Sequence, residues 1–158
     1  MGFIHQDIKP DNILAKYRIL KKKRSYVQYT KRPNLLNDIY LIDFGNVEKY
    51  KLDNGEVRPQ ESLNLVIGRK DYMSVNALDF KTQSRRDDLH SLVYTLINLR
   101  CGMHLNYNQK KKLSPLDLCV FGNLPGFDQV FQEMLCLGYK DEPNYNKIVF
   151  LFEKILLD

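Results

Sequence analysis

The chain has 158 residues, of which 44% are hydrophobic and 11% aromatic, and its formal net charge is +5. This length and composition fit one globular domain and exclude a disordered chain. No apolar run approaches the ~18 residues of a membrane-spanning helix, and residues 5–12 are too polar for a signal peptide. We therefore expect an intracellular protein, cytoplasmic or nuclear, without a membrane span. Three widely spaced cysteines predict reduced thiols and no zinc site: Cys101, Cys119 and Cys136.

The excess positive charge comes from one segment. Residues 16–32 hold eight Lys or Arg side chains and no acid, so the remainder of the chain is net negative. The favoured interpretation is a solvated loop, and the alternative is an insert that binds an anionic partner. Three tyrosines between the charges are compatible with base stacking, so nucleic acid is a disfavoured but open partner: Tyr17, Tyr26 and Tyr29.

The first half of the chain is predicted to hold short strands and long loops. Residues 3–15 fit a strand, a polar loop and a second strand. Residues 39–42, Ile-Tyr-Leu-Ile, are a β-prone run that stops at Asp43-Phe44-Gly45. Residues 46–68 contain the turn signal Asp53-Asn54-Gly55 and show no clean period, which predicts a loop.

Helices are predicted for the second half. Apolar residues recur at helical spacing in three stretches: residues 82–101, 127–137 and 145–156. The first of these is apolar on more than one side, which predicts a buried central helix ended by Gly102. Ser114-Pro115 is a start signal for a short additional helix, and Asn144 is a candidate N-cap. The fold class is therefore α+β and mainly α, with the chemistry in the front half.

Two short motifs in the front half carry that chemistry. The first is His5-x-Asp7-x-Lys9-x-x-Asn12, and the second is Asp43-Phe44-Gly45 at the end of a β-prone run. Either motif alone is weak, because strings of three residues occur by chance. In this order, and each beside a short strand, they resemble the catalytic-loop and metal-binding signatures of protein kinases.

Phosphoryl transfer explains the residue types in these motifs, because it requires positioning and charge neutralisation. Asp7 would receive the proton of the attacking hydroxyl, and Lys9 would offset the charge of the transferred phosphoryl group. Asn12 and Asp43 offer the oxygen ligands that Mg²⁺ prefers. We therefore assign Asp7 and Lys9 as catalytic, Asn12 and Asp43 as metal ligands, and Lys9 with both ligands as the ATP-binding set.

Three further residues of the motifs are assigned structural support. His5 is expected to pack into the core and hold the loop by hydrogen bonds, and a general-base role for His5 is the less favoured alternative. Phe44 is expected to be a packing residue, and Gly45 completes its motif.

Beyond these motifs, the chain resembles the casein kinase 1 group of protein kinases, with the vaccinia-related kinases as relatives. The resemblance rests on four stretches: Gln83–Leu92 (QSRRDDLHSL), Gly68–Leu78 (GRKDYMSVNAL), Ser114–Cys119 (SPLDLC) and Tyr139–Leu156. In the second stretch Ser74-Val75-Asn76 takes the place of the usual Ala-Pro-Glu. The resemblance implies that Asp88 is the buried aspartate that holds the catalytic-loop backbone.

The resemblance also implies a partial kinase domain over residues 1–158, the C-terminal lobe of a protein-kinase-like fold. Its expected parts are the catalytic loop and first hairpin strand (1–15), a basic insertion (16–38), the second strand, metal-binding motif and activation segment (39–78), and a helical core (79–158). No Gly-rich loop or strand lysine precedes His5, so we expect the N-terminal lobe to be absent. Its absence predicts an exposed apolar patch: Ile4, Ile13, Leu14, Leu41 and Ile42.

Three residues depart from the family pattern. Gln6 stands where an arginine normally clamps an activation-loop phosphate, which predicts independence from such phosphorylation. Arg69 replaces a threonine and is placed to pair with Asp7 and lower its basicity. Asp71 replaces an arginine of the group's phosphate-recognition site.

The function implied is a serine/threonine kinase that uses ATP and Mg²⁺ to phosphorylate hydroxyls of protein substrates. As a fragment, the chain is expected to be inactive alone, because half of the nucleotide-binding machinery is missing. The alternative is a catalytically dead, pseudokinase-like scaffold or binding module.

Overall fold

The structure is a computed structural model that describes residues 2–15, 19–23, 26–29 and 39–157. It divides into two compact units, Met1–Lys9 with Phe44–Asp158, and Pro10–Asp43. Each unit is described by itself.

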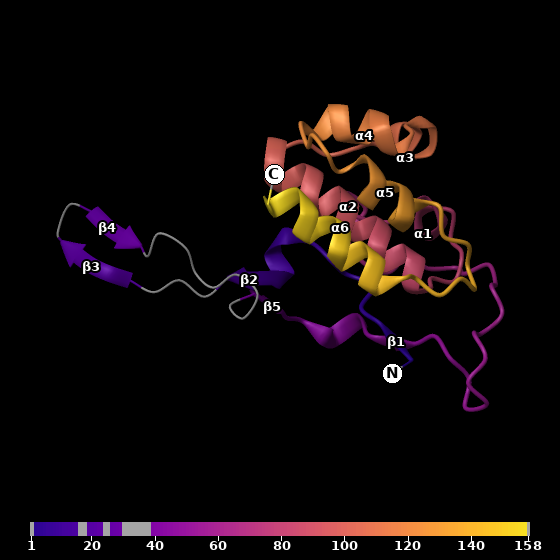
Figure 1. Cartoon of the computed structure of the whole chain (residues 1–158). Coiled ribbons are helices and arrows are strands. Elements are labelled where there is room, and N and C mark those ends of the chain that lie inside the picture. Colours follow the sequence, from indigo (N-terminus) through magenta and orange to yellow (C-terminus); the bar gives the residue numbers. More distant parts are fainter. Residues whose placement is uncertain (1, 16–18, 24–25, 30–38, 158) are drawn as a thin grey trace. The chain divides into compact units, whose positions relative to one another are not determined.

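The larger unit is built from helices. They are α1 (Val75–Leu78), α2 (Arg85–Cys101), α3 (Tyr107–Lys112), α4 (Pro115–Gly122), α5 (Asp128–Leu135) and α6 (Tyr145–Leu157). Helix α2 packs against α4 and α5, and α5 packs against α6 (Figure 1). In the part of the chain that the structure describes, none of the helices has both the length and the apolar character needed to cross a membrane.

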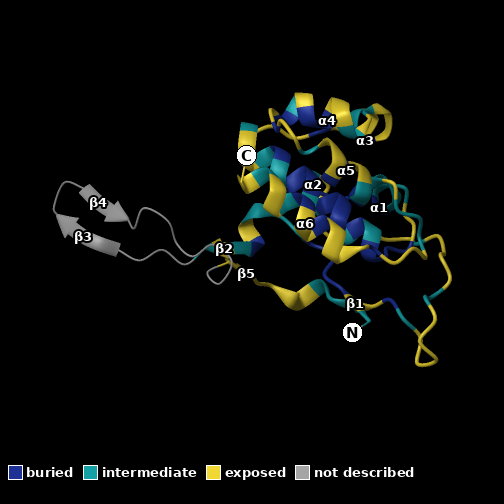
Figure 2. Cartoon of the chain, in the orientation of Figure 1, coloured by how far each residue is buried: buried dark blue, intermediate teal, exposed yellow. Residues whose placement is uncertain are grey.

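The predicted central helix is confirmed. Helix α2 runs through the middle of the helical layer and is the most continuously buried element in Figure 2. Val93 and Ile97 have no exposed area, and burial of such a side chain stabilises a fold by about 1.5–3 kcal/mol. The α5 side chains Val130, Phe131 and Met134 are equally buried. The periodic apolar residues of the sequence therefore form the core.

The helix boundaries follow local hydrogen-bonding chemistry. Ser114 Oγ accepts from the N–H of Asp117 at 3.2 Å, and Asn144 Oδ1 accepts from the N–H of Lys147 at 3.0 Å. Both side chains thus cap helices at the positions predicted. Gly102 ends α2 with φ 71°, a left-handed conformation that favours glycine. The short helices α1 and α3 were not predicted, because they are too short to show a period.

A small ladder completes the larger unit. Strand β1 (Phe3–Ile4) pairs antiparallel with β6 (Glu48–Lys49), with Ile4 opposite Glu48. Strand β6 lies in the stretch predicted as loop, where two residues are too few to give a strand pattern. Ile4 is only 4% exposed, so its predicted place in an exposed apolar patch is wrong.

The smaller unit contains two ladders. The 3₁₀ turn η1 (Pro10–Asn12) leads into β2 (Ile13–Ala15), which pairs antiparallel with β5 (Ile39–Leu41). Strands β3 (Ile19–Lys23) and β4 (Tyr26–Tyr29) pair antiparallel within the basic segment. The loop prediction is therefore wrong for these residues, where β-branched and aromatic residues favour strands. The rest of segment 16–32, and with it the predicted anion-binding surface, lies outside the described residues.

Candidate active site

The backbone of the predicted catalytic loop is held by a carboxylate of the central helix. Asp88, in the first turn of α2, accepts hydrogen bonds from the N–H groups of His5 at 2.7 Å and Gln6 at 2.9 Å, one on each oxygen. Burial raises the pKa of the Asp88 carboxyl, and the two N–H donors oppose that rise by favouring the charged form. The contact implied for Asp88 by the resemblance is therefore present.

The two predicted catalytic side chains of the loop lie together. Lys9 Nζ is 2.5 Å from Asp7 Oδ2, and the two side chains are 18% and 7% exposed. Between them, the carbonyl of Ile8 accepts a hydrogen bond from Thr95 Oγ1 of α2 at 3.4 Å. The loop thus presents a carboxylate and an ammonium group. Its backbone is held by two side chains of α2, Asp88 and Thr95.

His5, the predicted supporting residue, contacts the loop and Phe44. Its side chain is buried, and its Nδ1 accepts a hydrogen bond from the N–H of Asp7 at 3.4 Å. Its ring meets the ring of Phe44 edge-on, with centroids 5.3 Å apart. Phe44 itself is 63% exposed, and its ring packs against the ring of His5. Gly45 lies with Phe44 in the short 3₁₀ turn η2 (Phe44–Asn46).

Gln6 adopts a left-handed backbone conformation directly before the predicted base, with φ 65°. Such a conformation costs a non-glycine residue roughly 1–3 kcal/mol and is concentrated at functional sites. The Gln6 side chain is buried and donates to Glu48 Oε2 at 3.1 Å. Glu48 in turn accepts from Arg58 Nη1 at 2.5 Å. A neutral amide on a salt-bridged glutamate therefore takes the place of the expected arginine.

The backbone of Gly68 lies close against this loop. A Cβ atom on Gly68 would lie 2.5 Å from the carbonyl oxygen of Gln6, closer than non-bonded atoms approach. Its φ of 102° also favours glycine. Residue 68 therefore has to be glycine for the segment after it to run beside the catalytic loop.

Asp87 has a role that the sequence did not reveal. Its fully buried carboxylate accepts from Ser74 Oγ at 2.5 Å, from Asn76 Nδ2 at 3.4 Å and from the N–H of Ser84 at 2.7 Å. An aspartate in the first turn of a helix also interacts favourably with the helix dipole. In the structure, Asp87 ties the Ser74-Val75-Asn76 motif to the start of α2.

Lys110 is a second functional side chain missed by the sequence. It is 6% exposed, and its Nζ donates to the carbonyls of Lys70, Asp71 and Met73 at 2.8–3.0 Å. The ammonium also lies 4.5 Å from the centroid of the Tyr94 ring. Burial lowers the pKa of Lys110 to about 8, and the charge of Asp71 opposes this shift. Lys110 therefore fastens the segment that follows Gly68 onto the helical core.

Two of the three departures from the family pattern, Arg69 and Asp71, lie on the segment that Lys110 holds. Arg69 Nε is 3.3 Å from Asp71 Oδ2, and its guanidinium lies 5.8 Å from the centroid of the Tyr72 ring. A carboxylate at this distance partly offsets the charge of Arg69. The suggested pairing of Arg69 with Asp7 stays a prediction.

The two predicted metal ligands belong to the smaller unit, at one end of its β2–β5 ladder. Asn12 directly precedes β2, Asp43 follows β5 by two residues, and the carbonyl of Asn12 accepts from the N–H of Ile42 at 2.9 Å. Asp43 has a left-handed backbone with φ 62°. One carboxylate and one carboxamide oxygen fit a Mg²⁺ ion that keeps its remaining sites for water and phosphate. The described residues contain no group of three His, Cys, Asp or Glu side chains placed to hold a metal.

Comparison with known proteins agrees with these motifs. The chain is 32% identical over 92% of its length to a probable serine/threonine-protein kinase of Dictyostelium discoideum. It is 31% identical over 98% of its length to a probable casein kinase I homolog of Encephalitozoon cuniculi, and 29% identical over 98% to casein kinase I homolog 3 of Schizosaccharomyces pombe. Over nearly its whole length the chain is therefore similar to casein kinase 1 homologues and to a probable serine/threonine kinase. No protein-family model matches it.

The chain spans less than half the length of those proteins: 28%, 48% and 36%, respectively. The similarity therefore concerns one portion of each longer kinase. The matches to the two casein kinase I homologs cover 98% of the chain, so both motifs, Asp88 and the helices fall within those matched regions.

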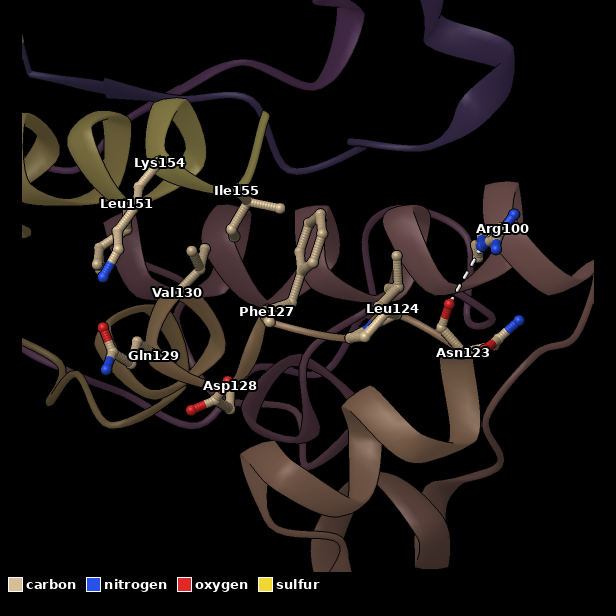
Figure 3. A pocket seen from close by; sticks show the side chains of 12 residues that line it. Arg100, Asn123, Leu124, Phe127, Asp128, Gln129, Val130, Leu151, Lys154 and Ile155 are labelled. Atoms are coloured by element: carbon tan, nitrogen blue, oxygen red, sulfur yellow. Dashed lines mark hydrogen bonds between the residues drawn. The ribbon is translucent and has the colours of Figure 1, made fainter. Parts of the chain in front are cut away.

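A separate groove of about 620 Å³ opens among the helices of the larger unit (Figure 3). It is lined by the end of α2, the turn between α4 and α5, and α6. Arg100 Nε donates to the carbonyl of Asn123 at one end of it, at 3.1 Å, and Phe127 and Ile155 lie along it. None of the predicted site residues lines this groove, so it carries no part of the kinase assignment.

Proposed function

We propose that the chain supplies the catalytic-loop half of a casein-kinase-1-like serine/threonine kinase domain, which transfers the γ-phosphate of ATP to hydroxyls of protein substrates. The observation that carries this proposal is the anchored loop: Asp88 holds the backbone at His5 and Gln6, next to the paired Asp7 and Lys9. Phosphoryl transfer depends on such positioning more than on covalent chemistry. The kinase names of the relatives support the same assignment.

The proposed roles follow from the chemistry of each side chain. Asp7 accepts the proton of the substrate Ser or Thr hydroxyl. Lys9 keeps the Asp7 carboxylate oriented and offers an ammonium to the transferred group. The oxygens of Asn12 and Asp43 would hold Mg²⁺. Bound ATP would supply the phosphoryl group, and the Mg²⁺ ion bound with it would offset part of its negative charge.

The larger assignment belongs to the same proposal. Residues 1–15 and 39–78 would form the catalytic loop, metal-binding motif and activation segment of a kinase C-terminal lobe, residues 79–158 its helical core, and residues 16–38 a basic insertion. An intracellular location is included because all three cysteines are free. The second candidate, a pseudokinase-like scaffold, is favoured by the Gln6–Glu48 contact, which replaces the expected arginine.

The test measures phosphate transfer to a Ser/Thr peptide library. It uses the chain itself and a chimera in which the chain follows the preceding part of the Encephalitozoon cuniculi relative. We expect the chain alone to be weak or inactive and the chimera to be active. Asp7→Asn should lower the chimera's rate by about 10²-fold or more. Asp11→Asn, the same change at an exposed carboxylate of the same loop, should leave the rate within about twofold.

Two results would contradict the proposal that the chain is part of an active kinase. The first is a chimera whose rate is unchanged by Asp7→Asn. The second is a folded chimera without turnover whose melting temperature does not rise with millimolar magnesium ATP. A ligand at ~100 times its dissociation constant adds about 2.7 kcal/mol of stability, so binding is readily detected. The second result favours the scaffold.

A further inference from the structure

The salt bridge between Glu48 and Arg58 lies next to the catalytic loop but contains none of the proposed catalytic residues. Arg58 Nη1 is 2.5 Å from Glu48 Oε1, and the two side chains are 39% and 41% exposed. Ion pairs that are this accessible to water contribute little to stability. The contact that this pair makes with the catalytic loop is therefore more informative than its contribution to folding.

The second oxygen of Glu48 holds the side chain of Gln6. Glu48 Oε2 accepts a hydrogen bond from Nε2 of the buried Gln6 amide at 3.1 Å. Because an ionised carboxylate only accepts hydrogen bonds, Gln6 has to turn its NH₂ group toward Glu48. Arg58 occupies the other oxygen, so the carboxylate is held from both sides.

The backbone of Gln6 makes this contact important, because it is left-handed with φ 65°. A residue other than glycine keeps such a conformation only where its surroundings over-determine it. The N–H of Gln6 donates to Asp88 Oδ1 at 2.9 Å, and its carbonyl lies against Gly68. Glu48 adds a hold on the side chain. Since Asp7 is the next residue, the conformation of Gln6 sets the direction in which Asp7 points.

Arg58 is fixed to the end of β6 by two backbone contacts. The N–H of Arg58 donates to the carbonyl of Tyr50 at 2.9 Å, and its Nη1 donates to the carbonyl of Lys49 at 3.1 Å. An antiparallel bridge between Lys51 and Val57 closes the hairpin that returns the chain to this point. The guanidinium group is therefore attached to the same strand that carries the carboxylate.

We propose that Glu48 and Arg58 are positioning residues of the catalytic loop. Arg58 fixes the Glu48 carboxylate, and the carboxylate holds Gln6 so that Asp7 keeps its orientation. This inference rests on the proposed kinase function. It means that the anion that steadies the loop is a side chain of the chain itself.

The kinetic test uses the chimera with the Encephalitozoon cuniculi relative. We expect Glu48→Ala to lower kcat at least about fivefold and to leave the KM for magnesium ATP within about twofold, because a displaced base slows the transfer step. The melting temperature should change by less than about 4 °C. Glu48→Gln keeps an oxygen that can accept from Gln6 and should restore kcat to within about twofold of the parent. Glu133→Ala removes a salt bridge of the same kind, to Lys147 at 2.6 Å, and should leave kcat within about twofold.

A double variant separates one chain of contacts from two independent ones. Arg58→Met should lower kcat less than Glu48→Ala does, because Arg58 acts through Glu48. The double variant should be no slower than Glu48→Ala alone. Losses that multiply in the double variant would overturn the proposal that Arg58 acts through Glu48.

Amide hydrogen exchange of the full chain gives a second readout that needs no turnover. Glu48→Ala should accelerate exchange at Gln6 and Asp7 at least about threefold, and Glu133→Ala should not. Unchanged exchange at Gln6, or an active chimera whose kcat does not respond to Glu48→Ala, would overturn the positioning role and leave the kinase function standing. An inactive parent chimera together with accelerated exchange would contradict the kinase function alone and support the hold of Glu48 on the loop.

Discussion

Two neighbouring carboxylates at the start of α2 serve two distant segments. Asp88 accepts from the backbone of His5 and Gln6, whereas Asp87 accepts from Ser74 and Asn76. Successive residues of a helix point about 100° apart, so adjacent aspartates reach different neighbours. The first turn of α2 therefore joins the catalytic loop and the Ser74-Val75-Asn76 motif through one rigid element.

This division predicts different local effects for the same substitution. Asp88→Asn replaces one accepting oxygen by an NH₂ group that faces a backbone donor, so we expect it to lower the free energy of unfolding by about 1–3 kcal/mol. Amide hydrogen exchange should accelerate at His5 and Gln6. Asp87→Asn, as the matched variant, should accelerate exchange at Ser74 to Ala77 instead. Identical exchange patterns in the two variants would contradict the division.

The site residues that could be predicted from the sequence are those that lie within short, recognisable motifs. The motifs and the resemblance singled out Asp7, Lys9 and Asp88, and the structure brings the first two together, while their catalytic roles stay a prediction. Lys110 escaped prediction because it opens the run Lys110-Lys111-Lys112, which looks like a solvated surface. Its burial depends on three carbonyls nearly forty residues away, and no local pattern records such a contact.

At the scale of elements, local signals were sufficient wherever a helix was long. Helices α2, α5 and α6 have apolar periods, and α4 and α6 begin at the capping residues predicted for them. Helix α3 is capped by Asn106, whose Oδ1 accepts from the N–H of Gln109 at 3.0 Å. This cap was overlooked because few apolar residues follow it. Strands of two or three residues, such as β6, depend on their partners and have no signal of their own.

The cap of α6 provides a test at this scale. Asn144→Ala removes the acceptor for the N–H of Lys147, and we expect a loss of about 1 kcal/mol in the free energy of unfolding. Asn146→Ala changes the same residue type at an exposed position in the first turn of α6 and should stay within about 0.5 kcal/mol of the parent. The comparison uses denaturant midpoints at constant slope. Equal losses in the two variants would show that Asn144 does not cap the helix.

For the larger unit as a whole, the sequence predicted which residues form the core, but it did not predict which apolar residues lie on the surface. The buried side chains of α2 and α5 follow the periodic pattern of the sequence. Ile4 was expected on an exposed patch, yet it is buried in the β1–β6 ladder, because the pairing of strands far apart in the sequence is invisible locally. Val149 and Phe150 show the converse, since both are more than half exposed on an otherwise regular helix.

Because of Lys110, the free energy of unfolding of this unit should change with pH in the alkaline range. Its pKa is about 8 in the folded chain and 10.5 in an ordinary environment, so the unfolded chain binds more protons between these values. The free energy of unfolding of the parent should therefore rise with pH across this window, relative to a variant without the amine. One pKa unit corresponds to about 1.4 kcal/mol, which sets an upper limit of ~3 kcal/mol for the gain. The three carbonyl acceptors favour the ammonium form and reduce the gain below that limit.

Lys110→Met is the variant that isolates this effect, because it keeps the unbranched side chain and removes the titrating group. Denaturant unfolding of both proteins at pH 7 and pH 10 gives the difference directly, and the raised pKa of Tyr94 cancels because that residue is present in both. We expect the parent to gain stability relative to Lys110→Met as the pH rises. A difference that stays constant would mean that Lys110 titrates at the same pH folded and unfolded. A difference that moves in the opposite direction would mean that the carbonyl cage holds the ammonium more tightly than water does.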